Sequence, residues 1–159
     1  MIGSLSMPNQ KWICNMRTVI IKQKDEQQIY SVPSIQDWKE IAKLLLSSLH
    51  PGMILTLSGQ LGAGKTTLVQ ALADELGAAK RPQSPTFALL RTYSFPSKNN
   101  VERLVHVDAY RIENEKDLLA LDLDEELADG KSILVTEWPE NIQNWIKNRL
   151  KSIVEIVIA

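Results

Sequence analysis

The sequence predicts an α/β fold of three layers, with helices on both faces of a mostly parallel central sheet that also carries an antiparallel hairpin. Three observations predict it. Short apolar runs of β-type alternate with segments whose apolar residues recur at helical spacing. A glycine-rich loop, residues 59–64, joins one such run to one such helix. The chain has 159 residues, the size of one ordinary domain.

Composition excludes several classes of protein. Lys and Arg number 18 and Asp and Glu 19, so no overall basic field favours nucleic acid, and any RNA contact is local or made by a partner. The single cysteine, Cys14, excludes an internal disulfide and suits a reducing cytoplasm. The chain has only two histidines in addition to this cysteine, which disfavours a His/Cys metal site. No apolar run approaches the ~20 residues of a membrane span, and the first residues lack a signal-peptide core. We therefore expect a cytoplasmic protein with no membrane partner.

The chain is expected to begin with a tail and to continue into the edge of the sheet. Residues 1–15 show no periodicity, so we expect them to lie outside the fold, and residues 16–159 to form the domain. The segments 18–21 and 27–32 are β-like and flank a polar turn. They predict two short strands at a sheet edge.

A helix is predicted to begin at Ser34. Asp37 follows three residues later, which resembles a capping box. Trp38 is interpreted as a core anchor. The alternative places the start of this helix, with Ser34 as a candidate nucleotide contact, near a bound base on which Trp38 stacks. The apolar residues on one face of the predicted helix are Trp38, Ile41, Ala42, Leu45 and Leu49.

The glycine-rich loop carries the P-loop (Walker A) pattern, in which Gly59 is followed after four residues by Gly64-Lys65-Thr66. The β-type run 53–58 precedes it. A helix follows, in which leucines recur every fourth residue up to Gly77, where a C-cap glycine belongs. An ordinary glycine-rich turn is the alternative, but this context favours a nucleotide site. The pattern therefore predicts a P-loop NTPase fold.

The spacing of the motif follows from phosphate chemistry. Glycines carry no Cβ, so backbone N–H groups can approach phosphate oxygens, and the start of the helix adds its positive dipole end. We expect Lys65 to reach the β- and γ-phosphates and the Thr66 hydroxyl to ligate Mg²⁺. The residues expected to contact the nucleotide through this motif are Gly59, Gly62, Ala63, Gly64, Lys65, Thr66 and Thr67.

A loop and a hairpin are predicted to follow the P-loop helix. Residues 78–85 are too rich in proline and charge to be regular. The runs 86–93 and 101–108 read as strands, and the polar segment 94–100 lies between them. They predict an antiparallel hairpin.

The C-terminal third is predicted to alternate helix and strand. Residues 112–130 contain eight acidic residues and one basic residue among leucines, which indicates two short helical pieces with an acidic face. That face is interpreted as solvated surface, and a docking face for a basic partner is the alternative. Residues 132–136 read as a buried strand, 141–150 as a helix and 153–158 as a last strand.

Two predicted strands end in a carboxylate, Asp108 and Glu137. A P-loop enzyme needs such a group to hold Mg²⁺ or to orient the attacking water, and ligands sit beyond the carboxyl ends of parallel strands. Thr86, at the junction of a loop and a strand, is a candidate sensor of the γ-phosphate; a plain β-favouring threonine is the alternative. His106 is interpreted as a hydrogen-bonded core residue and not as a base.

The motifs of guanine-specific P-loop proteins indicate which nucleotide to expect. The chain has no Asn-Lys-x-Asp motif, since 114–117 has the wrong order, and its Asp-x-x-Gly after the P-loop, residues 74–77, falls at the end of the predicted P-loop helix and not at a strand end. Guanine specificity is therefore disfavoured, and we expect ATP with Mg²⁺.

Four motifs together resemble one family. They are Gly59–Thr67, Ser84–Phe87, His106–Arg111 and Glu137–Glu140. In this order they are similar to TsaE, the small bacterial ATPase of tRNA threonylcarbamoyladenosine synthesis. The resemblance implies an ATPase that works with the partners TsaD and TsaB, reaches tRNA only through that complex, and supports repeated turnover without performing the transfer.

The resemblance also implies roles for single residues. Lys65 would contact phosphate, Thr66 and Glu137 would ligate Mg²⁺, Asp108 would support hydrolysis, Thr86 would belong to a switch-like loop, and Trp138 would lie beside the nucleotide. Two rivals remain at this point: a small-molecule P-loop kinase, and a module that binds ATP without hydrolysing it.

Overall fold

The computed structural model describes residues 16–83, 88–149 and 153–159, and its strands form a single seven-stranded sheet. The strands are β1 (Arg17–Gln23), β2 (Glu26–Val32), β3 (Ile54–Gly59), β4 (Leu90–Lys98), β5 (Val101–Asp108), β6 (Ser132–Glu137) and β7 (Ile153–Ile158). Their order across the sheet is β2-β1-β7-β3-β6-β5-β4. The four central strands β7, β3, β6 and β5 pair in parallel, and antiparallel pairs close both edges. The predicted fold class is confirmed.

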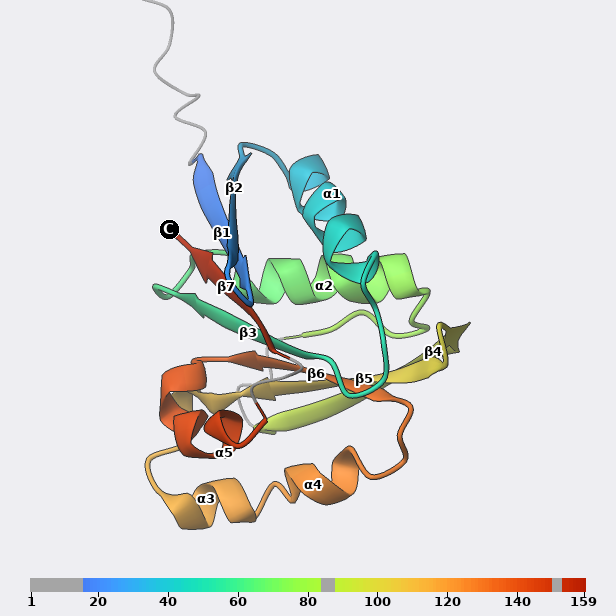
Figure 1. Cartoon of the computed structure of the whole chain (residues 1–159), viewed down its shortest axis with the longest axis vertical. Coiled ribbons are helices and arrows are strands. Elements are labelled where there is room, and N and C mark those ends of the chain that lie inside the picture. The colour runs from blue at the N-terminus through green and yellow to red at the C-terminus, as the bar shows by residue number, and fades with distance from the viewer. Residues whose placement is uncertain (1–15, 84–87, 150–152) are drawn as a thin grey trace, which may run out of the picture.

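Helices cover both faces of the sheet and make the predicted three layers. They are α1 (Ile35–Leu46), α2 (Lys65–Leu76), α3 (Glu115–Leu119), α4 (Leu123–Glu126), α5 (Gln143–Lys147) and the 3₁₀ turns η1 (Ala109–Arg111) and η2 (Pro139–Ile142). Figure 1 shows α1 and α2 on one face and the shorter helices α3, α4 and α5 on the other. Within the described ranges, no helix combines the length and the apolar character that crossing a membrane requires.

The N-terminal strands and helix agree with the prediction. β1 and β2 form an antiparallel hairpin at one edge of the sheet. The helix α1 follows Ser34, whose backbone N–H donates to the Asp37 carboxylate (2.9 Å), the acidic half of a capping box. Trp38 is 7% exposed and lies in the core, as the core-anchor interpretation requires. The predicted tail, residues 1–15, lies outside the described residues.

The hairpin β4–β5 exists, but the predicted bounds of its first strand are wrong. The prediction ran over 86–93, whereas β4 begins at Leu90 and continues to Lys98. The segment 94–100 looked like a loop because it contains Pro96. β4 is an edge strand, where a missing N–H is tolerated. The turn itself is only Asn99-Asn100, both with positive φ (51° and 63°).

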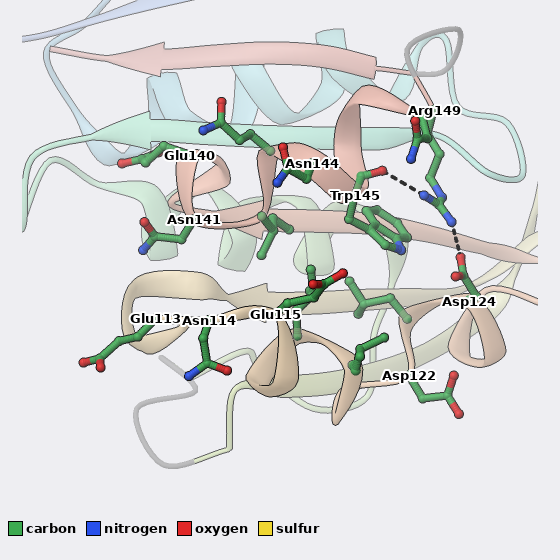
Figure 2. A pocket seen from close by; sticks show the side chains of 16 residues that line it. Glu113, Asn114, Glu115, Asp122, Asp124, Glu140, Asn141, Asn144, Trp145 and Arg149 are labelled. Atoms are coloured by element: carbon green, nitrogen blue, oxygen red, sulfur yellow. Dashed lines mark hydrogen bonds and ion pairs between the residues drawn. The ribbon is translucent and has the colours of Figure 1, made fainter.

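The C-terminal region contains the two short acidic helices that were predicted, α3 and α4. They face η2 and α5 across a groove, shown in Figure 2. The predicted helix 141–150 is wrong in its bounds, because the chain forms the 3₁₀ turn η2 first and α5 spans only Gln143–Lys147. Pro139 explains the 3₁₀ start, since it fixes φ and lacks an N–H.

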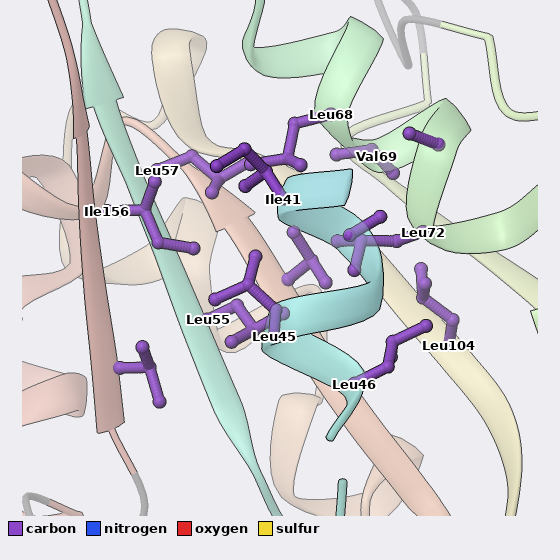
Figure 3. Packing of buried hydrophobic residues seen from close by; sticks show 14 of the residues in the cluster. Ile41, Leu45, Leu46, Leu55, Leu57, Leu68, Val69, Leu72, Leu104 and Ile156 are labelled. Carbon is purple, nitrogen blue, oxygen red and sulfur yellow. The ribbon is translucent and has the colours of Figure 1, made fainter. Parts of the chain in front are cut away.

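The sheet separates two apolar cores. The larger lies between α1, α2 and the sheet, and the smaller lies between the sheet and the short helices. Side chains from α1, α2 and strands of the sheet pack against one another in the larger one (Figure 3). Examples are Ile41, Leu45, Leu55, Leu57, Leu68, Leu72, Leu104 and Ile156. Burial on both faces keeps the carboxyl ends of β3, β5 and β6 in fixed positions.

Candidate nucleotide-binding site

The glycine-rich loop lies at the carboxyl end of β3, and at two of its glycines the neighbouring groups leave no room for a side chain. A Cβ on Gly59 (φ +154°) would lie 2.5 Å from the carbonyl oxygen of Ile158 in β7. A Cβ on Gly64 (φ +113°) would lie 2.7 Å from Cζ2 of Trp38 in α1. Both positions therefore require glycine, for conformation and for space.

Lys65, the first residue of α2, folds back over the loop. Its Nζ donates to the carbonyl oxygens of Gly59 (2.7 Å) and Gln60 (2.9 Å), and it lies 4.3 Å from the centre of the Trp138 ring. Burial lowers the pKa of Lys65 from its ordinary value, while the carboxylates of Glu137, Asp108 and Glu140 oppose the shift. The ammonium is thus held within the loop by groups that a phosphate can replace.

Glu137 ends β6 and is 3% exposed. Its Oε1 accepts from the Thr66 hydroxyl (2.9 Å) and lies 3.0 Å from Nε2 of His106. Because a carboxylate oxygen only accepts, Nε2 carries the proton, and the fully buried Nδ1 has no hydrogen-bond partner among the described residues. Two donors therefore fix one oxygen of this carboxylate.

Asp108 ends β5 and lies opposite Glu137 in the parallel register of β5 and β6. Its Oδ1 accepts from the backbone N–H of Tyr110 (3.1 Å), an N-cap of η1. The Tyr110 ring packs on Trp138, with centroids 4.9 Å apart. Trp138 has φ +58°, a sparsely populated conformation for a non-glycine residue and one that clusters at functional sites.

A cavity of about 200 Å³ brings most of the predicted site residues together. Leu61, which is 81% exposed, also lines it and was not singled out from the sequence. Gly59 and Ala63 belong to the same loop but are not among the residues that line the cavity, and Thr86 lies outside the described residues. The predicted residues that line the cavity are Gly62, Gly64, Lys65, Thr66, Thr67, Asp108, Glu137 and Trp138.

Ser34 is not among the residues that line this cavity. Its hydroxyl and its N–H both pair with Asp37 at the exposed start of α1. The Trp38 side chain is buried, and its ring lies next to Gly64. A contact of Ser34 with the nucleotide stays a prediction.

Sequence reasoning missed two long-range contacts that shape the site. Arg17 of β1 donates to the carbonyl oxygen of Gly62 in the loop (3.1 Å). Asn141 of η2 donates to the carbonyl oxygen of Ala109 in η1 (2.9 Å), which ties together the two turns that follow the site carboxylates. No local sequence pattern predicts either contact, because both depend on the order of the strands in the sheet.

The donor set fits a magnesium ion bound together with a nucleotide. Thr66 and Glu137 place a hydroxyl and a carboxylate side by side at the start of α2. Mg²⁺ typically takes one or two protein oxygens and completes its octahedron with water and phosphate oxygens. Among the described residues no group of three or more His, Cys, Asp or Glu side chains is placed to hold a metal ion.

Comparisons with known proteins point in one direction. The sequence model of the family described as "Threonylcarbamoyl adenosine biosynthesis protein TsaE" matches residues 32–158. The chain is 36% identical over 121 residues to the tRNA threonylcarbamoyladenosine biosynthesis protein TsaE of Bacillus subtilis, covering 76% of this chain and 72% of the relative. It is 41% identical over 115 residues to the protein of that name from Streptomyces coelicolor, covering 71% and 75%. The crystal structure of Bacillus YdiB is similar with a TM-score of 0.51 and 27% identity, over 80% of this chain and 68% of that one.

Proposed function

The chain belongs to the TsaE family of threonylcarbamoyl adenosine biosynthesis proteins, and from this premise we propose that it is a Mg²⁺-dependent ATPase subunit that supports this modification of tRNA together with TsaD and TsaB. In this proposal it binds and hydrolyses ATP, and it reaches tRNA only through the assembly. The transfer of the threonylcarbamoyl group belongs to the partners.

One observation supports the proposal of ATP chemistry: the glycine-rich loop and two strand-end carboxylates line a single cavity. The loop offers backbone N–H groups and the positive end of α2, and Lys65 supplies a cation. Glu137 and Asp108 supply the negative groups that metal binding and water activation need. A glycine-rich turn with a purely structural role would not need both carboxylates beside it.

The proposed mechanism assigns each side chain one task. The Lys65 ammonium leaves the carbonyls of Gly59 and Gln60 and donates to phosphate oxygens. Thr66 and Glu137 would hold Mg²⁺, which would supply neutralisation of the phosphate charge when bound. Asp108 accepts a proton from a water whose oxygen attacks the γ-phosphorus; the bond to the bridging oxygen breaks, and ADP leaves.

A turnover assay tests this function and separates it from its rivals. The full chain with ATP and Mg²⁺ is expected to release inorganic phosphate, and Lys65→Ala is expected to abolish the release because it removes the phosphate cation. Phosphate that appears on an acceptor other than water would indicate a kinase. ATP binding with no release, alone or with the partners, would indicate a binding module.

The proposed partners are tested by co-purification of the chain from its native source. TsaD and TsaB are expected to be recovered with it. The same experiment is repeated with the Lys65→Ala chain as a second bait. If neither protein is recovered with either bait, the assembly part of the proposal fails, while the ATPase part stands on the turnover assay.

A further inference from the structure

We propose that the groove between α3–α4 and η2–α5, called here the acidic groove, is the docking site for a positively charged amphipathic segment of a partner protein. Its cavity of about 580 Å³ is larger than the 200 Å³ beside the glycine-rich loop. Figure 2 shows side chains from both walls pointing into the space between them. The inference deepens the proposed function, because it rests on the chain working within an assembly.

The floor of the acidic groove is apolar and incompletely covered. Leu123 and Ile142 are buried and reach the cavity from α4 and η2. The helix α3 has no buried residue, and Leu119 is 70% exposed although it lines the groove. The Trp145 ring lines the opposite wall. A helix that leaves a leucine in solvent beside a cavity has apolar surface available for a partner.

Carboxylates dominate the charged side chains that line the groove. Its one cation, Arg149, is already committed: it pairs with Asp124, donates to the Trp145 carbonyl oxygen (2.8 Å) and lies 3.9 Å from the Trp145 ring centre. Among the described residues, the other rim carboxylates make no ion pair. The five rim carboxylates are Glu113, Glu115, Asp122, Asp124 and Glu140.

Charge and shape select the occupant. Carboxylates crowded around low-dielectric walls attract cations and repel polyanions, which disfavours direct contact of this face with an RNA backbone. The described residues form no group of three or more potential metal ligands, so a bare metal ion is not the occupant. An amphipathic segment that places leucine-like side chains on the floor and lysine or arginine on the rim satisfies both features.

Binding of a defined peptide tests the proposal. The probe is a fluorescently labelled peptide of about 14 residues, with leucines at helical spacing and lysines elsewhere, titrated with the full chain at low salt. The groove variant carries Glu115→Lys together with Asp122→Asn. Its control, called the hairpin variant, carries Asp25→Asn together with Glu26→Lys. Both pairs change the net charge equally, and the second pair lies in the distant β1–β2 hairpin. We expect the groove variant to weaken binding by roughly tenfold and the hairpin variant by less than about twofold.

A second variant tests the apolar floor. Leu119→Asn changes an exposed side chain and leaves the fold intact, and it should weaken the peptide several-fold without changing the net charge. Equal weakening by the groove and hairpin variants, or no effect of Leu119→Asn, would overturn the proposal. ATP binding is measured on every variant and is expected to stay unchanged. If the wild-type chain did not bind ATP, that result would count against the proposed function. The peptide result would still decide the docking proposal.

Discussion

The two site carboxylates, Asp108 and Glu137, have different surroundings, and mutation can separate their roles. Glu137 is buried and held by Thr66 and His106, whereas within the described part of the chain the Asp108 carboxylate accepts only from a backbone N–H of its own turn. Glu137→Ala should therefore weaken Mg²⁺-dependent ATP binding. Asp108→Asn keeps the shape and should leave binding nearly intact while turnover falls by ~10²-fold. Titration calorimetry measures ATP binding by each variant, and phosphate release measures its turnover. The reverse pattern would show that Asp108 binds the metal and Glu137 supports hydrolysis.

His106 is expected to act as a positioning residue for Glu137. Its imidazole is fully buried, and its only hydrogen bond among the described residues goes to that carboxylate. His106→Leu should weaken ATP binding in Mg²⁺ by roughly tenfold, because the ligand loses its orienting donor. Binding measured in EDTA should not change.

The matched control for His106 is Thr136→Val, a neighbouring buried site whose hydroxyl contacts a backbone oxygen and not the carboxylate. It should leave the Mg²⁺ dependence unaltered. A similar loss with and without Mg²⁺ in His106→Leu would show a general structural role instead.

Lys65 should make ATP binding sensitive to alkaline pH. Burial lowers the pKa of its ammonium in the free protein, against the opposing carboxylates Glu137, Asp108 and Glu140. Phosphate needs the protonated form, so affinity is full below this pKa and is lost as pH rises above it, by up to ~10-fold per pH unit. The decline should begin before the ordinary lysine pKa is reached. Lys65→Arg, whose charge persists, should give a flat profile, and a flat wild-type profile would contradict the assignment.

At the scale of the elements, the β4–β5 hairpin depends on the two-residue turn Asn99-Asn100. Both residues adopt positive φ, and the Asn99 side chain also donates to the carbonyl oxygen of Leu49 (3.2 Å). Asn100→Gly, which gives the preferred Asn-Gly turn, should stabilise the protein by about 0.5 kcal/mol. Asn100→Val should cost about 1–2 kcal/mol, because a β-branched residue resists this conformation. Urea unfolding checks both, and equal stability of the two variants would contradict the role of the turn.

At the scale of the whole molecule, the fold is expected to begin with β1. A chain that starts at Met16 should melt within about 2 °C of the full chain, because residues 1–15 show no periodicity that would place them in a packed helix or strand. A chain that starts at Pro33 should melt much lower. It lacks the buried Val19 and Ile21 of β1 and the contact of Arg17 with the glycine-rich loop. A large drop for the Met16 chain would place the preceding residues in the fold.

The parts of the molecule that sequence could predict are those with local signals. The loop around Lys65 has a motif whose spacing reflects phosphate chemistry, and the runs that end at Asp108 and Glu137 have strand composition. The bounds of β4 were missed because Pro96 is a loop signal that an edge strand tolerates. The contact between His106 and Glu137 joins residues 31 positions apart, so it depends on the pairing of β5 with β6. No local pattern contains that information.

The position of β3 between β6 and β7 also has a consequence for the order of synthesis. A ribosome completes the glycine-rich loop long before it makes either strand that flanks β3. The carbonyl oxygen of Ile158, against which Gly59 fits, belongs to the last of these strands. We expect a nascent chain arrested after α2 to carry the whole phosphate-binding motif and still fail to hold a nucleotide. ATP binding by this protein would therefore report that translation has passed β7.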